Sequence, residues 1–280
     1  MSRASLASPY PELNAVLEEL LASVQHILAD QFIGMYLQGS FAVGDFDCHS
    51  DCDFVVVVDR ELSEPQCGSL QAMHERIFGL PSEWARHLEG SYFPKDLLRD
   101  HALTDADLWY LDNGSRSLVK SRHDNTAVVR WILRERGTVL AGPPASTLID
   151  PVPSTVLRRE ILQVFTDWGE EILADPQLIG NRFYQSFAVL SYCRMLHDLH
   201  TGVIGSKRSG AAWVTRRVDP SWHDLIDRAW AGRPNPAVSS REPANPADLA
   251  RTLEFIRVVL KQAHDHATAL QLAVERAPRP

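Results

Sequence analysis

The sequence lacks any apolar run of the roughly 18 to 20 residues that a transmembrane helix requires. Its N-terminus, MSRASLASPYPEL, also lacks the continuous apolar stretch of a signal peptide. Positive charge is scarce as well: 28 Lys and Arg stand against 36 Asp and Glu, for a net charge of −8. Because the apolar segments are missing, we expect a cytoplasmic protein that does not act on membranes. Because a general nucleic-acid-binding protein needs a positive surface, we also expect no nucleic-acid partner.

Cysteine is also rare, with four residues in 280. They are Cys48, Cys52, Cys67 and Cys193, and their number and spread do not resemble the dense spacing of a disulfide framework. Hydrophobic residues make up 45% of the chain and charged residues 23%, which is typical of a globular protein. An acidic protein of this kind can attract a cationic small ligand by electrostatic steering.

Strand signals are confined to the first half of the chain. Short apolar runs predict strands at 32–37, 54–58 and 85–93, and four consecutive valines at 55–58 are typical of a sheet core. Asn113-Gly114 predicts a hairpin between 108–112 and 115–120. Helices are expected at 11–28, where apolar residues follow a helical stripe, and from Asp124 or Asn125 as N-cap to Arg136.

Helix signals alone remain after residue 154. The segment GPPASTLIDPVPS, with four prolines between Pro143 and Pro153, is expected to join two domains. The predicted helices that follow cover 155–174, 182–200, 207–214, 221–230 and 246–274. The expected fold class is therefore α+β: a mixed sheet flanked by helices at 1–150, followed by a helical bundle domain at 151–280.

Two carboxylates and a Gly-Ser pair form the most informative motif. Asp51 and Asp53 precede the valine strand, and residues i and i+2 of a strand point to the same face. Like charges this close are unfavourable unless a cation lies between them, and hard oxygen ligands favour Mg²⁺. Gly39 lets the backbone approach a phosphate closely, and Ser40 adds a hydroxyl donor.

Glu89 is a third candidate in the next predicted strand. Alternation places it on the opposite face from Leu88 and Gly90, so it reaches the same pocket if the two strands are neighbours. Three such carboxylates suggest in-line displacement at phosphorus. The competing interpretation is a solvated turn at Asp51 and Asp53 and a surface glutamate at an edge strand. The upstream Gly-Ser pair and the buried strand that follows favour the functional interpretation.

Gly39-Ser40, the spacing from Ser40 to Asp51, and Asp53 resemble the signature of the nucleotidyltransferase superfamily related to DNA polymerase β. Within it, the sequence is similar to the aminoglycoside adenylyltransferases that modify streptomycin and spectinomycin, through the proline-rich segment and into the helical half. The resemblance implies ATP as co-substrate and Mg²⁺ held by Asp51 and Asp53. It also implies Glu89 as the general base.

The resemblance extends to basic residues of the helical half. Family members hold the ATP phosphates with an Arg and a Lys, and the segment VLSYCRMLHDLHTGVIGSK places Arg194 and Lys207 at the same separation. Without the resemblance, both would be ordinary cations on a helix surface. The sequence departs from the family at Tyr184, which stands where the drug-modifying enzymes have an acidic residue that contacts the antibiotic.

Two further residues are candidates for contact with the substrate. Trp109 is either a core residue or a stacking platform, and Asp124 is either a helix cap or a residue of the substrate pocket. The sequence thus predicts transfer of AMP from Mg-ATP to a hydroxyl of a small molecule, of which an aminoglycoside or aminocyclitol antibiotic is the first expectation. The alternatives are adenylylation of a protein or another metabolite, and a nucleotide-binding regulatory module without turnover.

Overall fold

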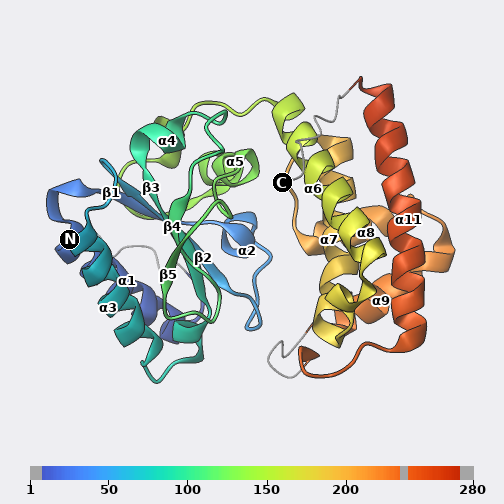
Figure 1. The fold of residues 1–280 in the computed structure, drawn as a ribbon, viewed down its shortest axis with the longest axis horizontal. Helices are drawn as coiled ribbons and strands as arrows, with labels where there is room; N and C mark the ends of the chain where they lie inside the picture. The colour runs from blue at the N-terminus through green and yellow to red at the C-terminus, as the bar shows by residue number, and fades with distance from the viewer. Residues whose placement is uncertain (1–7, 234–238, 272–280) are drawn as a thin grey trace. The chain divides into compact units, whose positions relative to one another are not determined.

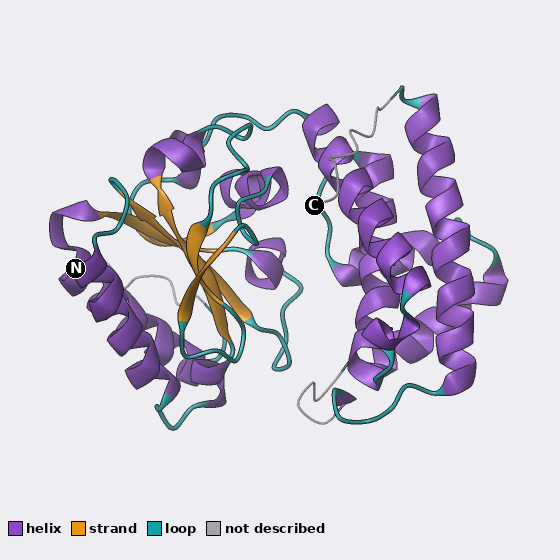
Figure 2. Cartoon of the chain, viewed as in Figure 1, coloured by secondary structure: helices purple, strands orange, loops and turns teal. Residues whose placement is uncertain are grey.

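The computed structural model describes residues 8–233 and 239–271, and it divides the chain into two compact units (Figure 1). The units are Met1–Val152 and Pro153–Pro280, so the division falls within the proline-rich segment. Strands occur in the first unit, whereas the second is built of helices (Figure 2). The fold class is α+β, as the sequence predicts.

A six-stranded mixed sheet forms the centre of the first unit. Its strands are β1 (Phe32–Leu37), β2 (Cys52–Val58), β3 (Leu88–Pro94), β4 (Leu108–Leu111), β5 (Leu118–Ser121) and β6 (Thr138–Ala141). Their spatial order is β5-β4-β3-β2-β1-β6. The pair β2 and β3 runs parallel, and the remaining neighbours run antiparallel.

One face of the sheet is covered by α1 (Pro11–Leu28) and α3 (Glu64–Phe78), which run along it side by side (Figure 1). The residues buried between them include Leu17, Leu70, Phe54, Val56 and Val58. The even-numbered residues of β2 therefore face these helices, because successive side chains of a strand alternate between the two faces.

The opposite face carries a smaller apolar cluster that leaves part of the sheet for polar groups. Val55, Val57 and Phe93 pack there against Leu98 of α4 (Lys95–Arg99) and Leu133 of α5 (Ala127–Arg136). This cluster covers the later residues of β2 and β3. The beginnings of these two strands carry acidic side chains on the same face, and α2 (Gly39–Val43) follows β1 nearby.

The second unit is a bundle of helices. They are α6 (Ser154–Ala174), α7 (Arg182–Thr201), α8 (Lys207–Thr215), α9 (His223–Gly232) and α11 (Pro246–Ala269). Asn245 caps α11 by accepting hydrogen bonds from the backbone N–H groups of Ala247 and Asp248, and Pro246 occupies the first turn, as predicted. Short 3₁₀ turns lie at Ala29–Gln31, Glu83–Arg86, Ala145–Thr147, Pro176–Ile179 and Pro220–Trp222.

Several predicted elements are shifted in the structure. The N-cap of α5 is Thr126, whose hydroxyl accepts from the Val129 N–H, and not Asp124 or Asn125. The strand expected at 85–93 begins later, at Leu88, because a 3₁₀ turn occupies Glu83–Arg86. The last helix ends at Ala269 in the described residues, and positions 272–274 of its predicted range lie outside them.

The Asn113-Gly114 hairpin forms with a different register. Leu111 pairs with Leu118, so six residues separate the strands where a two-residue turn was predicted. Four of the described helices and strands were missed altogether: α2, α3, α4 and β6. The signal for α3 was a capping box: Ser63 accepts a hydrogen bond from the backbone of Gln66, whose side chain accepts one from the Ser63 backbone. Among the helices that the structure describes, none has both the length and the apolar composition of a membrane-spanning segment.

A buried histidine lies between α3 and the sheet. His74 Nε2 and the hydroxyl of Tyr92 are 2.7 Å apart, and 2% of the His74 surface is exposed. Burial disfavours the charged imidazole and lowers the pKa of His74 to about 3. His74 therefore stays neutral in the folded protein over a pH range in which it is protonated in the unfolded chain.

This depressed pKa predicts a measurable loss of stability in acid. Below about pH 6.5 the unfolded chain binds a proton that folded His74 does not, so stability falls as the pH is lowered toward 3, by up to about 1.4 kcal/mol per pH unit. Denaturant unfolding at several pH values should show this contribution in the wild type and not in His74→Gln, which keeps a polar partner for Tyr92. Parallel stability curves for the two proteins would contradict it.

Candidate active site

The start of β2 presents two acidic side chains on one face of the sheet. Asp51 lies directly before β2 and Asp53 within it, and both are half-buried. Cys52, between them, points to the opposite face and is completely buried. Burial, followed by the negative charges of Asp53 and Asp51, raises the pKa of the Cys52 thiol well above its usual value.

Glu89 joins this pair because β2 and β3 are parallel neighbours. Asp53 is paired in register with Glu89, so the two side chains lie on the same face, as expected from the sequence. One carboxylate oxygen from each of Asp51, Asp53 and Glu89 lies within 4.8 Å of the other two. The structure thus brings together the three acidic residues that the sequence singled out.

Gly39 packs directly against the carboxylate of Asp53. Its φ is +55°, a left-handed conformation that glycine adopts readily, and a Cβ at this position would lie 1.8 Å from Oδ2 of Asp53. The preceding residue, Gln38, donates its backbone N–H to the Asp53 carbonyl at 2.9 Å. The hydroxyl of Ser40 is buried and has no hydrogen-bond partner within the described part of the chain.

Glu89 is held by two residues that the sequence analysis did not identify. The Tyr110 hydroxyl donates a 2.6 Å hydrogen bond to Oε1 of Glu89, and Nε2 of His123 lies 3.3 Å from the same oxygen. Burial and then this hydrogen bond raise the pKa of the Tyr110 phenol, so it remains a donor at neutral pH. The contact with Glu89 raises the pKa of His123 against the opposing effect of burial.

Asp124 is buried beneath the site. Its carboxylate accepts hydrogen bonds from Ser91 at 2.6 Å and from the Gln38 side chain at 3.2 Å, and 4% of its surface is exposed. Burial raises the pKa of Asp124 even though both hydrogen bonds act in the opposite direction. Asp124 thus connects the loop before Gly39 to the strand that carries Glu89.

Trp109 lies on the other face of the sheet. It pairs in register with Tyr92, and it packs against the core between the sheet and helices α1 and α3. Lys120 lies over its ring, 4.9 Å from the centroid. Of the two interpretations left open by the sequence, this placement fits a core residue, because Asp53 and Glu89 are on the opposite face.

The remaining candidates belong to the helical unit. Arg194 lies on α7 where α8 packs closely: a Cβ on Gly210 would meet the Arg194 Cα at 2.5 Å. Lys207 is the first residue of α8, and its ammonium group is 4.2 Å from the centre of the Phe187 ring. Tyr184, near the start of α7, is 48% exposed and contacts Phe183 edge to face.

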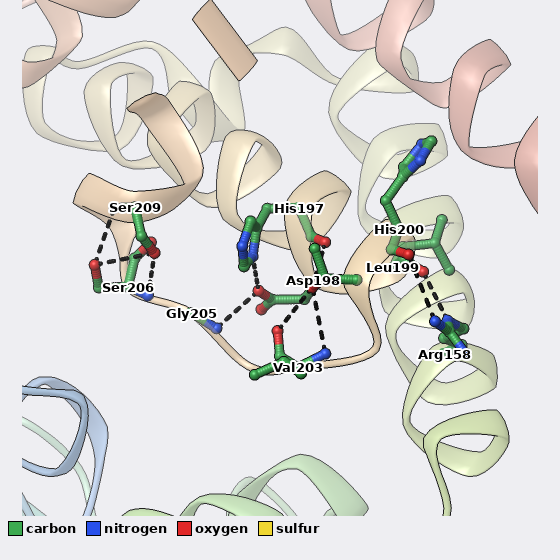
Figure 3. A network of polar contacts seen from close by, with 10 residues as sticks. Arg158, His197, Asp198, Leu199, His200, Val203, Gly205, Ser206 and Ser209 are labelled. Carbon is green, nitrogen blue, oxygen red and sulfur yellow. Dashed lines mark hydrogen bonds and ion pairs between the residues drawn. The ribbon is translucent and has the colours of Figure 1, made fainter. Parts of the chain in front are cut away.

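A polar network fixes the loop that leads to Lys207 (Figure 3). The buried carboxylate of Asp198 accepts hydrogen bonds from the Gly205 backbone at 2.8 Å and from His197 at 2.7 Å. Burial raises the pKa of Asp198, opposed by His197 and by the nearby charge of Arg194. Ser206 and Ser209 then cap α8 reciprocally, so the backbone around Lys207 is well supported.

A divalent cation fits the carboxylate cluster. The three oxygens are close enough to share one ion, and their mutual repulsion would be relieved by it. Carboxylate oxygens are of the hard type that Mg²⁺ prefers.

The chain is similar in sequence to known proteins. Residues 147–261 match the C-terminal domain of aminoglycoside adenylyltransferases. An aminoglycoside (3'') (9) adenylyltransferase of Escherichia coli is 23% identical over 260 residues, covering 82% of this chain and 89% of that protein. A spectinomycin 9-adenylyltransferase of Staphylococcus aureus is 26% identical over 231 residues, covering 76% and 82%.

The fold is shared with a solved structure of the same group. The spectinomycin adenyltransferase AAD(9) from Enterococcus faecialis, determined with ATP and spectinomycin, superposes with a TM-score of 0.65 at 17% identity. The match covers 88% of this chain and 98% of that one. Over most of its length this chain is thus similar in sequence to aminoglycoside adenylyltransferases, and it shares the fold of a spectinomycin adenyltransferase.

Proposed function

We propose that this protein transfers AMP from ATP to a hydroxyl group of an aminoglycoside or aminocyclitol antibiotic and releases pyrophosphate. The observation that carries the proposal is the convergence of Asp51, Asp53 and Glu89 on one face of the sheet, beside the tight turn at Gly39. The relatives named above act on aminoglycosides and spectinomycin, which supports this class of acceptor.

Glu89 is the proposed general base. Its side chain is 14% exposed, so it is reachable by an acceptor while partly shielded from water. In this mechanism Glu89 takes the proton of the acceptor hydroxyl as the oxygen attacks the α-phosphorus of ATP. Pyrophosphate leaves with the electron pair of the broken P–O bond. A positioned base of this kind contributes roughly 10²- to 10⁴-fold to a reaction rate.

Asp51 and Asp53 are the proposed Mg²⁺ ligands. When bound, Mg²⁺ would neutralise phosphate charge and align the α-phosphorus for in-line attack. The two carboxylates contribute orientation as well, because Asp53 is packed against Gly39 and its backbone is bonded to Gln38. The Gly39 backbone and the Ser40 hydroxyl are proposed contacts for the phosphates of ATP.

Arg194 and Lys207 are proposed ligands of the ATP phosphates in the helical unit. They lie on the closely packed helices α7 and α8, and the Asp198 network fixes the loop between these helices. A guanidinium and an ammonium group suit this task because both donate charge-assisted hydrogen bonds to phosphate oxygens.

A second candidate acceptor is a protein or another metabolite. Tyr184 favours it, because its exposed ring can stack on an acceptor and cannot neutralise an ammonium group. Phe183 and Phe187 extend the aromatic character of the first turns of α7. Measuring pyrophosphate release from Mg-ATP with a panel of aminoglycosides, aminocyclitols and neutral aromatic acceptors would separate the two possibilities.

Asp53→Asn should abolish turnover without unfolding the protein. The substitution removes a charge from the proposed metal site, so the transition state loses several kcal/mol of stabilisation. This loss corresponds to a fall in kcat of roughly 100-fold or more. Pyrophosphate release with Mg-ATP and an active acceptor measures the effect.

Asp59→Asn is the matched control, because Asp59 lies just beyond the other end of β2 and pairs with Lys95 at 2.5 Å on the surface. The control should retain wild-type kcat. Wild-type activity in Asp53→Asn would refute the metal assignment.

Gly39→Ala should weaken Mg-ATP binding about 10-fold or more, because its methyl group would displace the Asp53 carboxylate. Gly44→Ala is the control: φ is +75° there too, but open space surrounds the position. Gly44→Ala should lose only folding stability, by the roughly 1–2 kcal/mol that a left-handed conformation costs an L-residue. Isothermal titration with Mg-ATP distinguishes the variants, and equal affinities would argue against a role for Gly39.

A further inference from the structure

The two oxygens of the Glu89 carboxylate have different surroundings. Tyr110 and His123 both contact Oε1, at 2.6 and 3.3 Å. Oε2 receives no hydrogen bond from the residues that the structure describes. Because the Tyr110 hydroxyl donates to Oε1 and His123 contacts that same oxygen, both residues engage one side of the carboxylate and leave Oε2 to a different partner.

The two donors are themselves fixed by their positions in the fold. Tyr110 pairs in register with Ser91 on β3, which places its ring on the same face as Glu89. His123 follows β5 and stacks on Tyr110, with ring centroids 5.0 Å apart and an interplanar angle of 29°. Its neighbour Asp124 is anchored to Ser91 and Gln38, so the chain segment that carries His123 is tied to the sheet beneath the site.

Glu89 needs this support because its surroundings are acidic. Carboxylate oxygens of Asp51 and Asp53 lie within 4.8 Å of a Glu89 oxygen, and like charges would favour rotation of the side chain away from them. The hydrogen bond from Tyr110 opposes that rotation. Asp112 also lies 3.2 Å from the Tyr110 hydroxyl, but it is exposed, and the 2.6 Å contact with Glu89 is the shorter and stronger one.

We propose that Tyr110 and His123 are positioning residues that hold Glu89 through Oε1, so that Oε2 is the oxygen that accepts the proton of the acceptor hydroxyl. The inference rests on the proposed function and extends it to residues beyond the three carboxylates. The acceptor O–H bond breaks as its proton moves to Oε2, and the electron pair of that bond forms the new O–P bond. The P–O bond to pyrophosphate breaks, and its electron pair leaves with pyrophosphate.

Tyr110→Phe removes the donor and keeps the ring. We expect kcat to fall about 10- to 100-fold, while KM for ATP changes less than about twofold, because the hydroxyl orients the base and does not touch the nucleotide. His123→Ala should have a smaller effect, since 59% of the His123 side chain is exposed. His123→Gln should restore part of the lost kcat by supplying an amide donor.

Tyr92→Phe is the matched control. Tyr92 is also a sheet tyrosine whose hydroxyl contacts a histidine, His74 at 2.7 Å, but it faces α3 on the other side of the sheet. This variant should lose stability and keep its kcat when assayed well below its unfolding temperature. An unchanged kcat in Tyr110→Phe, or an equal loss in Tyr92→Phe, would overturn the proposal.

A second readout does not depend on turnover. In protein labelled with ¹³C at glutamate side-chain carboxyl groups, the Glu89 resonance can be assigned by its absence in Glu89→Gln. It should shift in Tyr110→Phe and His123→Ala and remain in place in Tyr92→Phe.

The two readouts separate failure of the inference from failure of the proposed function. A wild type that transfers AMP to no acceptor refutes the proposed function and, with it, the proton-accepting role of Oε2. A Glu89 signal that does not respond to Tyr110→Phe refutes the positioning contact, whatever the activity of the wild type.

Discussion

The parallel pairing of β2 with β3 is the constraint on which the site depends. Asp53 is paired with Glu89 in that register, and a shift by one residue would move Glu89 to the face covered by α1 and α3. Together with Asp51, this pair places three carboxylate oxygens within 4.8 Å of one another, an arrangement that is unfavourable without a cation or strong donors. Two neighbouring residues support this pair: Gly39 leaves room for the Asp53 carboxylate, and Tyr110 orients Glu89.

Local signals predicted much of the fold. The helical stripe at 11–28, the valine strand and the Asn245 cap correspond to α1, β2 and the start of α11. Predictions were wrong where tertiary contacts override local preference. Asp124 looks like a helix cap, but its carboxylate is needed by Ser91 and Gln38, so Thr126 caps α5 instead. The helix α3 was missed because its buried face includes His74 among few apolar residues.

The site was predictable where its residues are close in sequence or share a recognisable pattern. Asp51 and Asp53 are two positions apart, and alternation alone indicates that they share a face. Tyr110 and His123 could not be found in this way, because their contact with Glu89 depends on the registers of β3 with β4 and of β4 with β5. The Asn113-Gly114 pair predicted that hairpin but not its six-residue loop, which decides which residues face Glu89.

The proposed reaction is adenylyl transfer by this carboxylate cluster to a small-molecule hydroxyl. Mass spectrometry of the acceptor after incubation with ATP, Mg²⁺ and the protein tests it most directly. We expect an acceptor heavier by one adenylyl group with the wild type, and no such product with Glu89→Gln. An unmodified acceptor throughout a panel of aminoglycosides, aminocyclitols and other hydroxyl compounds, or an adduct formed equally well by Glu89→Gln, would contradict it.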